Sequence, residues 1–418
     1  MFFFNINTKG LFYTSLFIFM LIEISDFVIP FGASGDIDGF VLYYIIMFSY
    51  LASLFISSFY TKVIHCSLPN DIILNRILNK LFYISIIGFM LVIFDRIFIQ
   101  QIDYSQGVAL AREAWREQAK ERSGASSVFN VIGNLIFPMF YVVFFFLVSF
   151  YERVTKNNRK NLKWTVIFIL LFSALTGGRE PVLVFLSILT SAMIFRRSSG
   201  LNLLPQKIRF VTIFLCIAVI VFSIVIGLIR TQVYSFSLYE YGVSLSGRLG
   251  GRVTSDFNNL APDFLFPVLI YLAHTKWIFI NILTETQTLE GLSTFRQIWM
   301  MFHQYLPFIF TEYDSLPPLY TPNWISLIGS IYYDFGLLSA IFIFLIPWVF
   351  ILFMHSVFVM KMLNLSLVSF VFYACFSSII CFSIFSFLFE TVQFIYIFFS
   401  VPILFFFHCI ERAKYNNE

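Results

Sequence analysis

Charged side chains are scarce in this sequence. Only 12% of its 418 residues are Asp, Glu, Lys or Arg and 59% are hydrophobic, whereas about a quarter of the residues of a soluble protein are charged. So few charges cannot cover a water-exposed surface, which excludes a soluble enzyme, a disordered chain and a free nucleic-acid binder. The sequence therefore predicts an all-α polytopic membrane protein.

Cysteine is rare as well, and the sequence contains no glycine-rich nucleotide loop and no cluster of metal ligands. The five cysteines are Cys66, Cys216, Cys375, Cys381 and Cys409. Four of them lie in apolar runs or at the end of one, and no pair has the spacing of zinc ligands. We expect neither disulfides nor a structural metal, and no cofactor.

Apolar runs of roughly 20 residues are long enough to cross the hydrocarbon core of a bilayer. Ten predicted spans cover residues 11–31, 39–60, 81–100, 128–151, 164–176, 181–195, 210–229, 328–352, 365–387 and 391–410. Two further apolar stretches, 265–283 and 297–311, are expected as short or re-entrant helices and raise the count to 10–12. The first run continues past Glu23 and Asp26 with no cleavage site directly after it, which favours an uncleaved helix over a signal peptide.

The distribution of Lys and Arg over the loops predicts the orientation, because loops rich in these residues are cytoplasmic. One alternate set of loops, which includes both termini, holds 16 of the 27 basic residues: Lys9, Lys62, Arg76, Lys80, Arg153, Lys156, Arg159, Lys160, Lys163, Arg196, Arg197, Lys207, Arg209, Lys361, Arg412 and Lys414. The N- and C-termini are therefore expected inside. The other side carries two long segments, 101–127 and 230–325, so the single membrane domain 1–418 is expected to work on its outer face.

An arginine turn joins the two shortest predicted spans, 164–176 and 181–195, through Thr176-Gly177-Gly178-Arg179-Glu180-Pro181. At about 1.5 Å per residue these helices fall short of a full crossing, so the turn is expected below the outer surface. A cation at such a depth usually faces a cavity or a partner. Together with the two glycines and an outward-facing helix N-terminus, Arg179 makes a receptor for phosphate. The alternative is that Glu180 simply neutralises Arg179 in a tight turn.

Basic residues on the outer side are arginine far more often than lysine, nine against two. Arginine binds phosphate oxygens in a bidentate way and stays charged when desolvated, so this pattern favours a pyrophosphate ligand. Arg230 closes the 210–229 helix, where an ordinary interfacial arginine is equally common. Arg248 and Arg252 flank two glycines; they share a face if this segment is helical, and its N–H groups suit anions if it is a loop. A flexible, solvated loop is the remaining alternative.

Several other outer residues are candidates. His303 suits a general base, although a lone interfacial histidine without a function is at least as common. Asp334 lies within an apolar run and is expected to pair with an arginine, because a buried carboxylate usually finds a cation. The acidic and basic residues near the outer ends of other spans line a cavity or are interfacial; these are Glu23, Asp26, Asp95 and Arg96.

Residues 107–122 are expected to form an outer helix that serves as a lid or spacer. Glu113 and Arg116, and likewise Glu117 and Lys120, are three residues apart and support a helix. Asp36 and Asp38 lie in the first outer loop at a spacing that any short polar loop reaches by chance.

Four features together resemble the bacterial O-antigen polymerases, the Wzy-type family of oligosaccharide repeat-unit polymerases. They are the turn 176–181 between two spans, Arg230 at the end of the next span, the long outer loop 230–325 before the last three spans (328–410), and the segment 328–337, Ile-Gly-Ser-Ile-Tyr-Tyr-Asp-Phe-Gly-Leu. The resemblance covers most of the chain as architecture, and its motifs are short.

The resemblance implies a metal-independent, GT-C-like glycosyltransferase at the periplasmic side of the bacterial inner membrane. Its partners would be undecaprenyl-pyrophosphate-linked oligosaccharides, and a chain-length regulator is a further possible partner. Arg179 and Arg230, with Gly177 and Gly178, would bind the donor pyrophosphate and His303 would be the base. Arg248 or Arg252 would bind a second lipid phosphate or the moving glycan, and Asp334 would complete the substrate site. The alternatives are an O-antigen ligase, which has a similar plan, a lipid-linked oligosaccharide flippase, and a structural subunit of an export complex.

Overall fold

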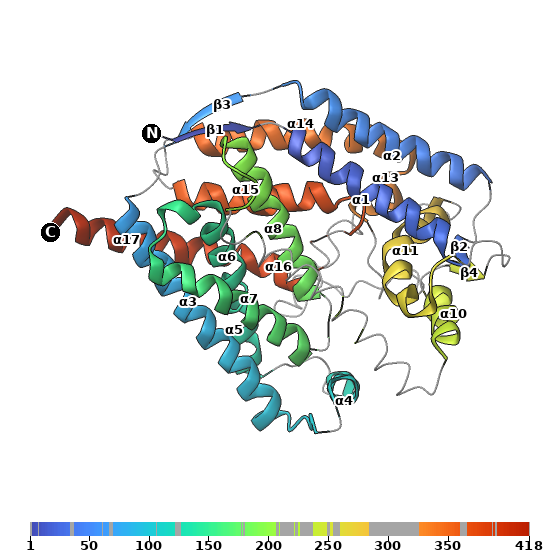
Figure 1. Cartoon of the computed structure of the whole chain (residues 1–418), viewed down its shortest axis with the longest axis horizontal. Coiled ribbons are helices and arrows are strands. Elements are labelled where there is room, and N and C mark those ends of the chain that lie inside the picture. Colours follow the sequence, from blue (N-terminus) through green and yellow to red (C-terminus); the bar gives the residue numbers. More distant parts are fainter. Residues whose placement is uncertain are drawn as a thin grey trace, which may run out of the picture.

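The computed structural model of the chain is a bundle of helices with a small two-stranded sheet at each of two opposite sides, and both chain ends lie at the same side of the bundle (Figure 1). The structure describes residues 2–6, 8–33, 37–60, 62–66, 70–105, 107–121, 127–176, 180–205, 237–248, 251–253, 260–283, 326–359, 366–386 and 391–417, together with Gly178, Arg209, Val221, Val225 and Leu388.

The helices of the first half are α1 (Lys9–Val28), α2 (Ile37–Ser57), α3 (Asp71–Phe94), the π-helix η1 (Asp95–Ile99), α4 (Val108–Glu121), α5 (Val128–Ile136), α6 (Met139–Ser149), the short 3-10 helix η2 (Tyr151–Arg153), α7 (Lys156–Thr176) and α8 (Glu180–Ser198). Those of the second half are α10 (Leu238–Arg248), η4 (Asp263–Leu265), α11 (Phe266–Leu283), α13 (Leu327–Phe335), η5 (Gly336–Leu338), α14 (Ser339–Val359), α15 (Ser366–Phe382), α16 (Val392–Ile397) and α17 (Ser400–Asn417). In the sheets, β1 (Phe2–Ile6) pairs with β3 (Lys62–Cys66), and β2 (Phe31–Ala33) pairs with β4 (Gly251–Val253), both antiparallel.

Among the described residues, eight helical segments are long and apolar enough to cross a membrane. This confirms a mostly helical, polytopic membrane protein. Seven of the eight coincide with predicted spans, and the eighth, Asp263–Leu283, contains the stretch 265–283 that was expected as a short or re-entrant helix. The predicted span 365–387 appears as the shorter helix α15, and 164–176 forms the second part of α7, which is not among the eight segments. Of 210–229 only Val221 and Val225 are described, and 297–311 lies outside the described ranges.

Two helices extend beyond the apolar runs that predict them. α3 begins at Asp71, ten residues before the expected start, with the Asn70 side chain accepting a hydrogen bond of 3.1 Å from the Ile72 N–H. α7 begins at Lys156 rather than near residue 164. In both cases the added turns carry lysine and arginine, which reach water at the membrane surface while the backbone remains helical.

Close approach of α3 and α5 depends on one glycine from each helix. A Cβ on Gly133 would lie 2.9 Å from the Gly88 carbonyl oxygen and 2.7 Å from a Val92 methyl carbon. A Cβ on Gly88 would lie 2.8 Å from the Phe137 backbone nitrogen. Small residues at a helix contact allow backbones to pack closely in membrane proteins, where no hydrophobic force drives association.

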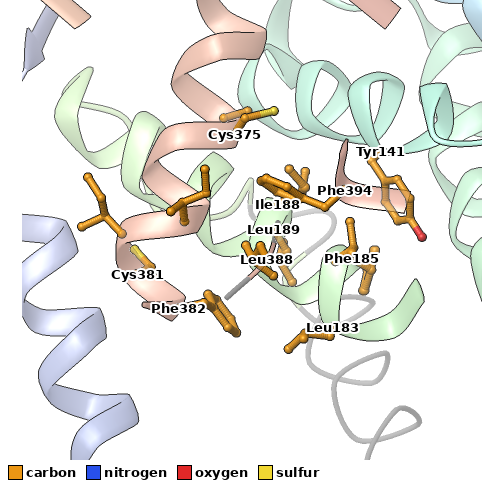
Figure 2. Close-up of a cluster of buried hydrophobic side chains, with 14 of the residues drawn as sticks. Tyr141, Leu183, Phe185, Ile188, Leu189, Cys375, Cys381, Phe382, Leu388 and Phe394 are labelled. Carbon is orange, nitrogen blue, oxygen red and sulfur yellow. The ribbon is translucent and has the colours of Figure 1, made fainter. Parts of the chain in front are cut away.

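The centre of the bundle is formed by α6, all of whose residues are buried. Figure 2 shows part of this core, in which side chains from α8 and α15 meet Tyr141 of α6 and Leu388 and Phe394 near α16. Cys375 and Cys381 lie in this core as free thiols, and Cys409 on α17 is also free. Large apolar side chains such as Phe17 and Phe27 of α1 are exposed, as expected for a surface that faces lipid.

Candidate functional site

The turn between α7 and α8 keeps the ends that the sequence predicts, with α7 ending at Thr176 and α8 beginning at Glu180. The helices are longer than expected, at 21 and 19 residues. At about 1.5 Å per residue α8 is long enough to cross the hydrocarbon core, but the first turns of α7 carry Lys156, Arg159, Lys160 and Lys163, and its apolar part is the expected 164–176, so the recess of the turn stays a prediction. Its described residues Leu175, Thr176 and Gly178 are nevertheless partly buried, because other elements pack over them.

Two side chains from distant segments bind the end of α7. The Arg96 guanidinium donates through Nη1 to the Leu175 carbonyl oxygen at 3.3 Å, and the Tyr104 hydroxyl donates to the same oxygen at 3.1 Å. The last carbonyls of a helix have no partner within the helix and form its negative end, so a cation is favourable there. Ser173 closes the turn locally by donating to the Gly178 carbonyl oxygen at 2.5 Å.

Arg96 is buried at 4% exposure, in the π-helix η1 at the end of α3. Its guanidinium carbon lies 4.6 Å from the centre of the Trp115 ring on α4, and this cation–π contact fixes the plane of the group. The Nε atom is buried and has no hydrogen-bond partner among the described residues. Short π-helical segments occur often at functional sites, because the extra residue reorients the side chains around it.

The carboxylate of the neighbouring Asp95 binds residues other than Arg96. Asp95 is fully buried, and it accepts hydrogen bonds from Gln100 and from Ser127, the N-cap of α5. Asp95 therefore joins η1 to α5. Arg96, one residue later, points its guanidinium to α4 and to the turn.

Glu180, the first residue of α8, is bound on the other side of the turn. Its carboxylate accepts a hydrogen bond of 3.2 Å from the Gln393 backbone N–H, in the first turn of α16, and lies close enough to Arg112 of α4 for the two charges to interact. The Tyr141 hydroxyl contacts the Gln393 side-chain oxygen at 2.7 Å and the Pro181 carbonyl oxygen at 3.2 Å. Glu180 thus has partners other than Arg179, and the turn is held by α3, α4, α6 and α16 together.

Of the predicted arginines, only Arg252 has a described side chain. Arg179, Arg230, His303 and Gly177 lie outside the described residues, so their roles stay predictions. Arg248 is the last residue of α10 and Arg252 lies in β4, so the two do not share a helix face. Arg252 is exposed rather than recessed.

The glycine before Arg252 explains how this segment is anchored. Gly251 pairs with Ala33 of β2, and a Cβ on it would lie 2.5 Å from a ring carbon of Trp277 on α11. Only glycine fits between the strand and this ring without displacing backbone or indole. The sequence predicted neither strand, and α10 and β4 lie apart from the α4 region in Figure 1.

Near this sheet lies a partly buried ionic cluster, which we call the Lys276 cluster: Lys276, Glu23, Asp26, Tyr44 and Trp277. The Lys276 ammonium lies 2.6 Å from a Glu23 carboxylate oxygen and 2.8 Å from one of Asp26. It also donates to the Tyr44 hydroxyl at 3.1 Å, and the Trp277 indole N–H donates to Asp26 at 2.5 Å. Two of the carboxylates predicted near outer span ends thus bind an α11 lysine.

Asp334 is buried at 1% exposure on α13. This short helix is capped by the Ser326 side chain, which accepts from the Gly329 N–H at 3.0 Å, and Tyr332 packs against Phe279 of α11. The sequence predicts that Asp334 pairs with one of the outer arginines; two of these, Arg179 and Arg230, lie outside the described residues, and the pairing stays a prediction.

Within the described part of the chain, no group of three or more His, Cys, Asp or Glu side chains is placed to hold a metal ion. No family model matches the chain, and no curated protein or solved structure is detectably similar to it. The candidate site therefore depends on its own geometry, and the best-described part is the α7–α8 turn.

Sequence reasoning did not predict the contacts of three cations that the structure places. Arg96 was named as a span-end residue that lines a cavity or is interfacial, Arg112 was counted only as an outer basic residue, and Lys276 only as one of two outer lysines. One signal was present in the sequence for Arg96, since it stands next to Asp95 within an apolar run where an ionisable residue is costly and usually functional. No pattern of spacing connects either arginine to residues 175–180.

Proposed function

We propose that this chain is a metal-independent membrane glycosyltransferase that polymerises lipid-linked oligosaccharide repeat units on the outer face of the bacterial inner membrane, with both termini in the cytoplasm. One observation carries the proposal most directly: Arg96 and Arg112 reach, from separate elements, the same turn whose sequence contains Arg179. Three arginines against Asp95 and Glu180 leave an excess of positive charge at the turn, which favours an anionic ligand.

The chemistry that this arrangement supports is the departure of a lipid pyrophosphate. A hydroxyl of the acceptor sugar attacks the anomeric carbon of the donor, the bond from that carbon to the pyrophosphate oxygen breaks, and the electron pair stays on the pyrophosphate. Negative charge therefore grows on the leaving group in the transition state. Arginines held in fixed positions stabilise this charge with little reorganisation, which is the largest single effect in many enzymes.

We assign the following roles to the predicted residues. Arg179 and Arg230 would bind the donor pyrophosphate, with the backbone at Gly177 and Gly178 approaching the phosphate closely. His303 would accept the proton of the attacking hydroxyl. Arg252 is exposed on β4, which suits the second lipid phosphate or the growing glycan better than the leaving group, and Arg248 just before it would act with it.

Lipopolysaccharide from a deletion strain tests the proposal against its alternatives. If the chain is a polymerase, the strain should produce lipid A core that carries a single repeat unit, and the wild-type gene should restore the ladder of chain lengths on a gel. Bare core instead would point to a ligase or a flippase. An unchanged ladder would reject the proposal for this polysaccharide and favour a structural subunit.

A further inference from the structure

The Arg96 guanidinium has three parts in defined surroundings. Its Nη1 is occupied by the Leu175 carbonyl oxygen, and its face is stacked on Trp115. Its Nε is buried and unpartnered among the described residues. The Nε edge of a guanidinium is one of the two edges through which arginine binds an oxyanion in a bidentate way. Arg96 thus has a fixed orientation and a buried Nε with no partner among the described residues.

The charge of Arg96 is only partly compensated. The negative end of α7 and the Trp115 ring both favour a cation, but neither supplies a full negative charge. Asp95 is engaged by Gln100 and Ser127, and no carboxylate within the described ranges forms an ion pair with Arg96. A buried charge without a partner is costly, and an unpaired buried donor in a native structure often marks the place of a bound ion or ligand.

The surroundings favour a doubly charged oxyanion over a single carboxylate. Arg112, on the same helix as Trp115, acts on the turn from the α4 side. The N-terminus of α8, a helix of 19 residues, begins at Glu180, five residues after the carbonyl that Arg96 binds. A helix N-terminus and arginine side chains together select phosphate groups.

We propose that Arg96 is an anion-binding residue of the α7–α8 turn, and that its Nε edge binds an oxygen of the substrate's pyrophosphate with Trp115 of α4 covering the guanidinium. The identity of the ligand as a lipid-linked pyrophosphate rests on the proposed function, whereas binding of pyrophosphate by Arg96 does not. This residue lies outside the motifs on which the family resemblance depends.

Binding of inorganic pyrophosphate to the purified full-length chain in lipid nanodiscs tests the inference. We expect Arg96→Gln to weaken binding about tenfold or more, since one charge-assisted contact is worth about that much. Arg96→Lys keeps the charge but lacks the Nε edge, and it should not restore the affinity. Arg153→Gln is the matched control, because this arginine pairs with Asp71 on the α3–η2 side, far from the turn. It should bind pyrophosphate as the wild type does.

A role of Arg96 in capping α7 alone gives a different pattern. In that case Arg96→Gln lowers the unfolding temperature without ligand, while the rise in unfolding temperature on adding pyrophosphate stays that of the wild type. That result, or an unchanged affinity, would overturn the inference. If Arg96→Gln does not fold, pyrophosphate binding is measured with Arg96→Lys and Trp115→Ala. Arg96→Lys keeps a cation at the end of α7, and Trp115→Ala keeps the arginine but removes the ring that covers it. Unchanged binding in both would again reject it.

A second arm separates the two sources of pyrophosphate. Undecaprenyl pyrophosphate in the nanodisc should compete with the inorganic ion and bind more tightly if the site takes a lipid headgroup, whereas a site for the free ion shows no gain from the lipid. Loss of pyrophosphate binding in Arg96→Gln would uphold the inference even if the deletion strain kept a normal ladder. If purified Arg96→Gln still bound pyrophosphate as the wild type does while the deletion strain had lost its ladder, the inference would be rejected and the proposed function would stand.

Discussion

Three buried cations of this molecule lie in three different environments. Lys276 is surrounded by two carboxylates and a tyrosine, and Arg196, at 1% exposure, binds both oxygens of Glu152 and three backbone carbonyls. Their hydrogen-bonding capacity is largely used within the chain, which is typical of structural ion pairs. Arg96 has one carbonyl and one aromatic ring. The contrast is between two cations that pair with carboxylates and one, Arg96, whose Nε has no hydrogen-bond partner among the described residues.

Removing the central arginine of the turn should stop chain growth. We expect Arg179→Ala to give core with a single repeat unit while the protein inserts in normal amounts, because the leaving pyrophosphate loses its main counter-charge. Arg179→Lys should restore only a small part of the ladder, since an ammonium offers a point charge instead of a fork. Gel analysis of a complemented deletion strain measures both, with Arg153→Ala as the control. A full ladder with Arg179→Ala would remove this residue from the site.

Removing the lysine of the Lys276 cluster should destabilise the fold. Lys276→Met leaves the partly buried carboxylates of Glu23 and Asp26 together without a cation. Breaking a fully buried pair costs about 3–5 kcal/mol, and the partial exposure of these carboxylates lowers that cost. The expected result is a large drop in unfolding temperature in detergent. Adding Glu23→Gln and Asp26→Asn should recover much of the loss, because the stranded charges are then gone. If the triple variant is no more stable than Lys276→Met, charge pairing is not what holds α11 on α1.

At the scale of the elements, the sequence predicts helices well where the signals are local. The helix expected at 107–122 is confirmed as α4, and the ends of α7 and α8 follow from Gly177, Gly178 and Pro181. The starts of α3 and α7 were placed too late, because the end of an apolar run marks the hydrocarbon boundary and not the last hydrogen-bonded turn. The strands β2 and β4 were missed, since three-residue strands carry almost no periodic signal and pair across more than half of the chain.

The contact between α3 and α5 provides a test at this scale. Gly133→Ala should lower the unfolding free energy by about 1–3 kcal/mol, because the added methyl overlaps the Gly88 carbonyl and Val92. Gly247→Ala is the matched control: it is also a helical glycine, and a Cβ there has no atom within 4 Å. It should be neutral or slightly stabilising. Equal effects of the two substitutions would contradict the close packing of α3 on α5.

The ion pair between η2 and α8 predicts a dependence on pH. Burial raises the pKa of the Glu152 carboxyl, but hydrogen bonds from Arg196 outweigh this effect and hold the pKa below its ordinary value. A carboxyl whose pKa is lower in the folded state stabilises the fold above the pKa of the unfolded chain, and this stabilisation is lost as the pH falls through the folded pKa. The unfolding temperature should therefore fall below about pH 4.5, and less steeply in Glu152→Gln.

Glu117→Gln, on the exposed face of α4, is the control for this measurement. It should leave the acid-side slope of the wild type unchanged. A slope in Glu152→Gln as steep as in the wild type would show that Glu152 does not contribute to the pH dependence.

At the scale of the whole molecule, composition alone settles the class of protein, since 12% charge cannot solvate a chain of this size. The grouping of Arg96, Arg112 and residues 175–180 could not be predicted, because it depends on how α3, α4 and α7 pack and not on any spacing in the sequence. The same holds for Lys276 and Glu23, which are 253 residues apart. Long-range side-chain partners are therefore where the structure adds most.

Orientation is the prediction that belongs to the whole chain. In a background with Cys409→Ser, a membrane-impermeant maleimide should label Asp103→Cys in cells with a permeabilised outer membrane, and should label Asn202→Cys only after lysis. Both residues are exposed, one in the segment after α3 and the other after α8. The opposite labelling pattern would reverse the orientation that Lys and Arg predict.

The bonds from Glu23 and Asp26 to Lys276 have a consequence for biosynthesis. Their ammonium partner is translated some 250 residues later, a delay of roughly 10 to 50 s at typical elongation rates. Until then the two carboxyls of α1 lack this counter-ion, and an unpaired charge in a membrane segment is costly. We therefore expect translation products that end before α11 to be degraded faster than products that include it.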